Sequence, residues 1–368
     1  MTPGPNAPHS IHLVADAFMH DLDPVLVHVA GPFAIRWYGL SYLVGFIVAW
    51  LILRWMAATK RLAVTPQQVG DYMMAVVVGV LVGGRLGYAA FYDQSLLLSP
   101  VDLIKVWDGG MASHGGMIGV ILATMWFAHR RGVSQLHMLD AAAFTCPPGL
   151  GFGRVANFIN GELWGKPIPA DQQVNPPWWS IQYWEQLRLF ARHDPMKLAD
   201  MTDVATAAGL DGGAWRREAL LLGVDGAQGQ EAARLMHGWI DGIGQQVRAG
   251  NEQVIDALRP VLTAYYPSQI IQAMAEGVIL FAALVLIWLV PRKPGVVGSW
   301  FLTIYGVLRV FTELFRQPDE GVAVIAGLQR GQLLSVAMIL AGLACLIVVS
   351  RRKVNPVSGL MRIQPARA

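Results

Sequence analysis

The chain has 368 residues, of which 54% are hydrophobic and only 14% charged, and its mean hydropathy is +0.42. Water-soluble domains carry about 25% charged residues, so this chain has too few polar side chains to cover a water-facing surface. The composition excludes an ordinary cytosolic enzyme, a disordered chain and a coiled coil, and it predicts an integral membrane protein.

Seven stretches are long and apolar enough to cross a bilayer, which takes about 20 residues. They span residues 33–56, 70–92, 113–130, 137–158, 269–290, 298–316 and 330–350. Residues 163–266, between the fourth and fifth stretches, are polar and have helical patterns near 215–223 and 229–248. We therefore expect an all-α integral membrane protein with seven transmembrane helices and a soluble head between helices 4 and 5.

Positive charge predicts the orientation, because cytoplasmic loops of membrane proteins are rich in Lys and Arg. In the short loops and the tail, twelve cations fall on one side of the predicted spans and three on the other. The twelve are Arg54, Lys60, Arg61, Arg130, Arg131, Arg292, Lys293, Arg351, Arg352, Lys353, Arg362 and Arg367, and the three are Lys105, Arg316 and Arg330. We expect the N-terminus outside and the C-terminus in the cytoplasm. The sequence pI of about 8.9 then reflects topology and does not indicate nucleic-acid binding.

This orientation divides the chain into five segments. They are an extracytoplasmic N-terminal segment (1–32), transmembrane helices 1–4 (33–162), the extracytoplasmic head (163–266), transmembrane helices 5–7 (267–350) and a basic cytoplasmic tail (351–368). The paired half-repeats that are typical of many transporters are absent from the sequence.

Polar side chains in the predicted spans gather near the outer membrane face, and such residues mark functional sites. Arg309 and Glu313 share one helix face, as do Arg154 and Asn157. The other members of this layer are Tyr38, Arg85, Ser113, His114, Asn160, Glu162, Tyr305 and Arg316. Two arginines suit a phosphate group and a histidine can act as a base, so the residues predict an outer-leaflet phospholipid site.

Plainer interpretations exist for these features. Arg309 and Glu313 would also pair simply to neutralise each other, and Arg85 lies in a glycine seam that favours a role in helix packing. No His, Cys or carboxylate set has the spacing of metal ligands, so we expect no metal. From the residues alone, a transferase, a transporter and a lipid-binding scaffold remain open.

Residues 153–165, which read GRVANFINGELWG, extend this interpretation. They resemble the signature of bacterial prolipoprotein diacylglyceryl transferases, G-R-x-(G/A)-N-F-x-N-x-E-x-x-G, at every specified position. Three further blocks are similar to that family: Trp37–Leu40, Trp107–Gly116 and Tyr305–Asp319. Residues 266–272 depart from it, since they read YPSQIIQ where the family usually has H-P-S-Q-L-Y-E.

The resemblance implies a reaction. The family transfers a diacylglyceryl group from phosphatidylglycerol to the lipobox cysteine thiol of a prolipoprotein, forming a thioether and releasing glycerol phosphate, in the first step of bacterial lipoprotein maturation. On this basis we expect His114 to act as the base, and Arg154 and Arg309 to stabilise the departing phosphate. We expect Asn157, Glu162 and Glu313 to orient these arginines, and Tyr38 and Tyr305 to line the head-group pocket. Gly165 and Arg316 are the other residues expected at the head-group site.

The resemblance also implies the surroundings of the reaction. We expect a multi-pass protein of the bacterial cytoplasmic (inner) membrane with its active site toward the outer leaflet. The expected partners are phosphatidylglycerol, the prolipoprotein signal peptide with its lipobox cysteine, and membrane lipid, with no cofactor and no nucleic acid. Two other functions remain as alternatives: a protein that binds or transports the lipid without consuming it, and an assembly scaffold that docks partners on the head.

Overall fold

The computed structural model of the chain describes residues 16–30, 33–105, 107, 109–317, 330–357 and 359–361. Asp108, Pro318, Asp319, Arg362 and Arg367, which the sequence analysis used, lie outside these residues, as does most of the predicted N-terminal segment. The described residues are mostly helical, as predicted, and they divide into two compact units. Unit 1 takes its described residues from Met1–Ala34, Asn157–Gln269 and Phe315–Gln317, and unit 2 from Ile35–Ala156, Ile270–Leu314 and Pro318–Ala368.

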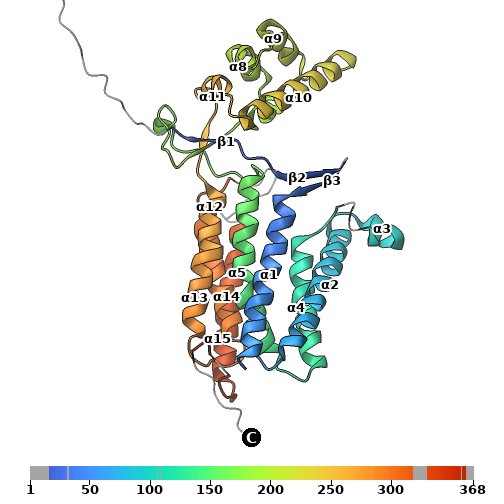
Figure 1. Cartoon of the computed structure of the whole chain (residues 1–368), viewed down its shortest axis with the longest axis vertical. Coiled ribbons are helices and arrows are strands. Elements are labelled where there is room, and N and C mark those ends of the chain that lie inside the picture. Colours follow the sequence, from blue (N-terminus) through green and yellow to red (C-terminus); the bar gives the residue numbers. More distant parts are fainter. Residues whose placement is uncertain are drawn as a thin grey trace, which may run out of the picture. The chain divides into compact units, whose positions relative to one another are not determined.

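Unit 2 is built mainly from long helices whose axes run roughly parallel (Figure 1). They are α1 (Trp37–Ala58), α2 (Pro66–Phe91), α4 (Ser113–Arg130), α5 (Gln135–Ile159), α13 (Leu280–Trp288), α14 (Val296–Glu313) and α15 (Arg330–Arg351). The last residues of α5 belong to unit 1. Between α2 and α4 lie η1 (Gln94–Leu98) and α3 (Pro100–Ile104), and α13 follows α12 (Ser268–Gln272) and a π-helical segment, η4 (Ala273–Ile279).

Four helical stretches among the described residues are long and apolar enough to cross a membrane. They are Trp37–Ala58, Pro66–Phe91, Ser268–Trp288 and Gly331–Arg351, which coincide with the first, second, fifth and seventh predicted spans. At the other three positions the chain forms α4, α5 and α14, in which glycines, two prolines or charged residues interrupt the apolar run. As membrane spans these three stay predictions, and so do the orientation of the chain and the location of the head.

Small residues let two helices of unit 2 approach closely. Gly79, Gly83 and Gly87 of α2 face Gly115 and Gly119 of α4, and a Cβ added to Gly87 would lie 2.8 Å from the Cα of Gly115. A spacing of four residues places these glycines on one face of each helix. The predicted glycine seam is confirmed as a helix–helix contact.

The helices of unit 1 pack around a hydrophobic core that includes Trp184, Trp215, Met236 and Ile240. They are α6 (Gln186–His193), α7 (Pro195–Ala199), α8 (Thr202–Ala207), α9 (Gly212–Leu221), α10 (Ala227–Arg248) and α11 (Glu252–Leu258). A short 3-10 turn, η3 (Ala170–Gln172), precedes them. The helical patterns predicted near 215–223 and 229–248 correspond to α9 and α10.

Two small β-sheets, which the sequence analysis did not predict, accompany the helices. In the first, β1 (Phe18–His20) pairs in parallel with β4 (Ile181–Tyr183), which pairs antiparallel with β5 (Ala264–Tyr265). The second pairs β2 (Val25–Ala30) with β3 (Phe33–Arg36). The strands of the first sheet have two or three residues each, too few for an alternating pattern to stand out in the sequence.

Candidate active site

The two arginines of the predicted phosphate site share one buried carboxylate. Glu276 accepts a hydrogen bond from Nε of Arg154 at 3.2 Å and another from Nη1 of Arg309 at 3.1 Å. Arg309 also forms an ion pair with Glu313, at 3.1 Å between Nη2 and Oε2. The hydroxyl of Thr312 donates to Glu276 at 3.4 Å. One carboxylate of unit 2 therefore connects α5, η4 and α14.

Helices α5 and α14 bring the arginines to the same level because they are joined near their first residues. Asp140 of α5 accepts hydrogen bonds from the backbone N–H groups of Gly295 and Gly298 at the start of α14, each at 2.7 Å. The steps from 140 to 154 and from 295 to 309 are both 14 residues, which is about 21 Å of helix. Equal lengths of parallel helix thus place Arg154 beside Arg309.

Glu276 reaches both arginines from the π-helical segment η4. The next residue, Gly277, lies against Gly151 of α5, and a Cβ added to Gly277 would lie 2.8 Å from the Cα of Gly151. This close contact lets Arg154, three residues after Gly151, reach the carboxylate. π-Helical turns are rare and often occur at functional sites.

The four charged side chains of this cluster differ in exposure. Glu276 is fully buried and Glu313 is 3% exposed, whereas Arg154 and Arg309 are 19% and 14% exposed. Buried charges require partners, and two arginines with two carboxylates make the cluster formally neutral. An arriving anion would meet the guanidinium groups first, because the carboxylates lie deeper.

In unit 1, the signature residues form a closed turn at the end of α5. The N–H of Glu162 donates to the carbonyl of Asn157 at 3.1 Å, and Gly161 permits this closure with a φ of +62°. The side chain of Asn157 donates to the carboxylate of Glu162 at 2.8 Å. The resemblance to the family implied that both residues orient the arginines. The structure pairs them with each other, and the partners that it gives the arginines are Glu276 and Glu313.

Gly165, the last residue of the signature, occupies a position where no side chain fits. A Cβ there would lie 2.9 Å from the carbonyl oxygen of Phe315 and closer still to that of Tyr266. Gly165 also forms an isolated antiparallel bridge with Arg316. Packing of the backbone therefore requires this glycine, and its expected contact with the head group stays a prediction.

The residues that match the family within 266–272 hold the signature turn in place. The hydroxyl of Ser268 donates to the carbonyl of Leu163 at 3.0 Å, and the amide of Gln269 donates to the carbonyl of Glu162 at 2.7 Å. Gln272, where the family usually has Glu, is 1% exposed, and in the described structure its Nε2 has no hydrogen-bond partner. The departure thus places an unpaired donor in the protein interior.

The other predicted residues lie in the first turns of α1 and α4 and along α14. Tyr38 packs its ring against Tyr42, and Tyr305, one turn before Arg309, stacks on Phe301. His114 is exposed in the first turn of α4. Within the part of the chain that the structure describes, no hydrogen bond or ion pair joins this histidine to either arginine.

Arg85 has the structural role that the glycine seam favoured. It is 6% exposed, and its guanidinium donates to the carbonyl groups of Asp102, Leu103 and Gly109. These residues lie in the segment that leads into α4. Arg85 therefore fixes the loop before His114.

Glu276 was not among the predicted site residues, although the sequence contained an indication of it. It is an acidic residue within the predicted fifth span, 269–290, and ionisable residues in spans mark functional sites. The departure from the family pattern at 266–272 lies in the turn just before it. Among the described residues, no three His, Cys, Asp or Glu side chains gather closely enough to hold a metal ion.

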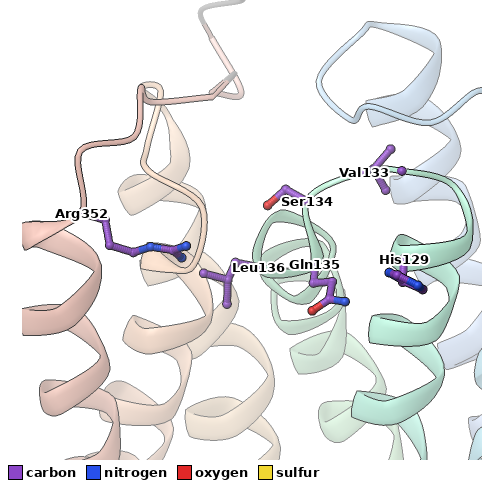
Figure 2. Close-up of a pocket in the computed structure, with 7 residues that line it drawn as sticks. His129, Val133, Ser134, Gln135, Leu136 and Arg352 are labelled. Carbon is purple, nitrogen blue, oxygen red and sulfur yellow. The ribbon is translucent and has the colours of Figure 1, made fainter.

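A separate cavity of about 340 Å³ lies at the start of α5 (Figure 2). It is lined by His129, Gly132, Val133, Ser134, Gln135, Leu136 and Arg352. Arg154 follows Leu136 by 18 residues along this helix, which is about 27 Å. The cavity is therefore distinct from the arginine cluster.

Comparison with known proteins identifies the family of the chain. The profile of the prolipoprotein diacylglyceryl transferase family matches residues 24–348. Proteins named phosphatidylglycerol–prolipoprotein diacylglyceryl transferase from Bdellovibrio bacteriovorus and Ralstonia pickettii are each 38% identical to it, over 94% and 90% of this chain and 97% and 95% of their own. One with the same name from Photorhabdus laumondii is 37% identical, over 92% of this chain and 96% of its own. The chain therefore belongs to the prolipoprotein diacylglyceryl transferase family.

Proposed function

We propose that this chain is a membrane transferase that moves the diacylglyceryl group of phosphatidylglycerol to the lipobox cysteine thiol of a prolipoprotein. The family and the name shared by its relatives support this reaction. One structural observation supports the site: the guanidinium groups of Arg154 and Arg309 are accessible, and the carboxylates that hold them are buried.

The reaction exchanges a carbon–oxygen bond for a carbon–sulfur bond. The cysteine thiolate attacks the carbon of the diacylglyceryl group that bears the phosphate ester. The carbon–oxygen bond breaks, and its electron pair leaves with glycerol phosphate. The thiol proton passes to a base. His114 is our candidate, because an imidazole accepts protons and its side chain is exposed to an arriving peptide.

Negative charge grows on the phosphate as it departs, and Arg154 and Arg309 stabilise that charge. Removing one fixed donor of this kind typically lowers the catalytic rate about 10²- to 10³-fold. Glu313 holds Arg309 in place. The residues that we propose to line or shape the head-group site are Tyr38, Asn157, Glu162, Gly165, Tyr305 and Arg316.

We also infer the setting from the charge pattern and the family. The enzyme lies in the bacterial cytoplasmic membrane with its active site toward the outer leaflet, where the signal peptide of a translocated prolipoprotein presents its cysteine. Four helices that are long and apolar enough to cross a membrane support a membrane location.

The test is to incubate the purified protein with phosphatidylglycerol vesicles and a lipobox peptide, and to follow the peptide by mass spectrometry. We expect a mass gain of one diacylglyceryl group, and no gain when serine replaces the lipobox cysteine. No adduct, together with bound phosphatidylglycerol recovered intact, would overturn the proposal and favour a lipid-binding or transport protein.

A further inference from the structure

Glu276 lies between the two arginines and accepts a hydrogen bond from each. Its Oε2 faces Arg154 at 3.2 Å and its Oε1 faces Arg309 at 3.1 Å, so each guanidinium has one oxygen of the same carboxylate. A phosphate offers the same kind of acceptor oxygens to a pair of arginines. An anionic head group and Glu276 therefore compete for the same donors.

The backbone around Glu276 is specialised to hold this one side chain. Glu276 lies within the seven-residue π-helical segment Ala273–Ile279. Gly277 permits the contact with α5, and Thr312 donates to the carboxylate from α14. Its side chain has no exposed surface, so the charge of Glu276 is balanced by these protein partners and not by water.

The charge balance of the cluster changes during the reaction. Arg154 and Arg309 are neutralised by Glu276 and Glu313 before lipid binds. A phosphodiester brings one negative charge, whereas a phosphate monoester such as glycerol phosphate carries about −1.5 to −2 at neutral pH. Repulsion from the buried carboxylates is therefore stronger for the product than for the substrate.

We propose that Glu276 is a positioning residue that acts as an internal counter-ion: it aligns Arg154 with Arg309 and, by competing with phosphate, promotes the release of glycerol phosphate. This inference rests on the proposed function. If Glu276 only neutralised the charge of the buried arginines, its removal would affect the stability of the fold and not the binding of the product. The counter-ion role adds a specific consequence, because removing its charge must strengthen binding of the product.

The test compares Glu276→Gln, Glu276→Asp and the unchanged protein, each purified as a monodisperse sample. Lipidation of the peptide gives kcat and KM, and direct titration with sn-glycerol 1-phosphate gives its dissociation constant without turnover. We expect Glu276→Gln to bind glycerol phosphate about tenfold more tightly and to have a kcat at least tenfold lower. Glu276→Asp keeps the charge on a shorter side chain. Its kcat and its dissociation constant for glycerol phosphate should therefore lie between those of Glu276→Gln and the unchanged protein.

The matched control is Glu231→Gln, which breaks an exposed pair with Arg234 on α10 and should leave both quantities unchanged. Product binding that stays equal or weakens in both Glu276 variants would overturn the counter-ion role. If only one of these variants folds, the test compares its dissociation constant for glycerol phosphate with that of the unchanged protein. Absence of transfer by the unchanged protein would refute the proposed function instead, and the titration would still test the competition at Glu276.

Discussion

At Arg154 and Arg309 the planar guanidinium matters as well as the positive charge. Arg154 contacts Glu276 through both Nε and Nη2, each at 3.2 Å, and an ammonium group has no equivalent of this fork. We therefore expect Arg154→Lys and Arg309→Lys to lower the rate of transfer at least about tenfold although each keeps its charge. The measurement is the rate of peptide lipidation by each purified variant.

The matched control for these variants is Arg234→Lys. Arg234 is 77% exposed in its pair with Glu231, and surface pairs of this kind contribute little to stability. This variant should transfer at the rate of the unchanged protein. Near-normal transfer by either Arg154→Lys or Arg309→Lys would contradict the assignment of that arginine to the phosphate.

Spacing along the sequence predicted only part of this cluster. Arg309 and Glu313 are four residues apart on one helix, so the pattern alone predicts their contact, and the structure confirms it. Arg154 and Glu276 are 122 residues apart, and their contact depends on a π-helical turn and a glycine contact. Neither feature leaves a periodic trace in the sequence, which is why Glu276 could be suspected only from its charge within an apolar span.

At the scale of elements, Asp140 sets the relation between the two helices that carry the arginines. Its carboxylate is 2% exposed and accepts two backbone hydrogen bonds at the start of α14. We expect Asp140→Ala to lower the free energy of unfolding by about 2 to 4 kcal/mol, because it leaves two buried donors unpaired and removes an anion from a helix N-terminus. Chemical denaturation of the detergent-solubilised protein measures this change.

A second helix cap provides the comparison for Asp140. Thr65 caps α2 in an exposed capping box with Gln68, and Thr65→Ala should cost about 1 kcal/mol. The rate of transfer should fall in Asp140→Ala, because Arg309 is no longer held beside Arg154. The rate should stay normal in Thr65→Ala. Equal losses of stability and activity in the two variants would show that Asp140 has no special part in placing α14.

The contact between β1 and the start of α6 predicts a pH dependence of stability in unit 1. Burial raises the pKa of Glu185 to about 7, and Nδ1 of His20 lies 3.9 Å from its carboxylate. The folded protein therefore keeps Glu185 protonated at pH values where the unfolded chain is ionised. Stability from this group is complete below about pH 4.5 and is lost as the pH rises to about 7.

Glu185→Gln removes this titration and should therefore be the more stable protein at neutral pH. The pKa shift corresponds to about 3 kcal/mol, so the melting temperature of the variant should exceed that of the unchanged protein at pH 8 and approach it at pH 5. Burial lowers the pKa of His20, which favours folding at higher pH, but this histidine is present in both proteins. A difference in melting temperature that stays constant from pH 5 to pH 8 would exclude the raised pKa.

Helices were predicted better than strands for a physical reason. A helix of unit 2 is held by contacts between residues close in sequence, and its apolar composition makes it recognisable in the sequence. The sheet of unit 1 joins β1, β4 and β5 from three distant segments, so its pairing depends on contacts that form only in the folded unit. The interruptions of α4, α5 and α14 have a similar origin, since their glycines and polar residues serve contacts between helices.

At the scale of the whole molecule, the distribution of cations carries the prediction of topology. The loops and tail on one side of the predicted spans hold twelve Lys and Arg residues, and the short loops on the other side hold three. Cytoplasmic loops retain such residues because translocating them across the membrane is unfavourable. The same asymmetry predicts that the signature turn and the arginine cluster lie near the outer leaflet, where the thiol of a translocated prolipoprotein would be available.

Cysteine labelling of intact cells tests this topology. Cys146→Ala and Cys345→Ala give a background without cysteines, to which Arg234→Cys in α10 or Lys353→Cys in the tail is added. An impermeant maleimide should label Arg234→Cys in intact cells and Lys353→Cys only after the membrane is opened, because the predicted head is outside and the tail inside. The reverse pattern would place the head in the cytoplasm. The arginine cluster would then lie toward the inner leaflet, out of reach of a translocated lipobox cysteine.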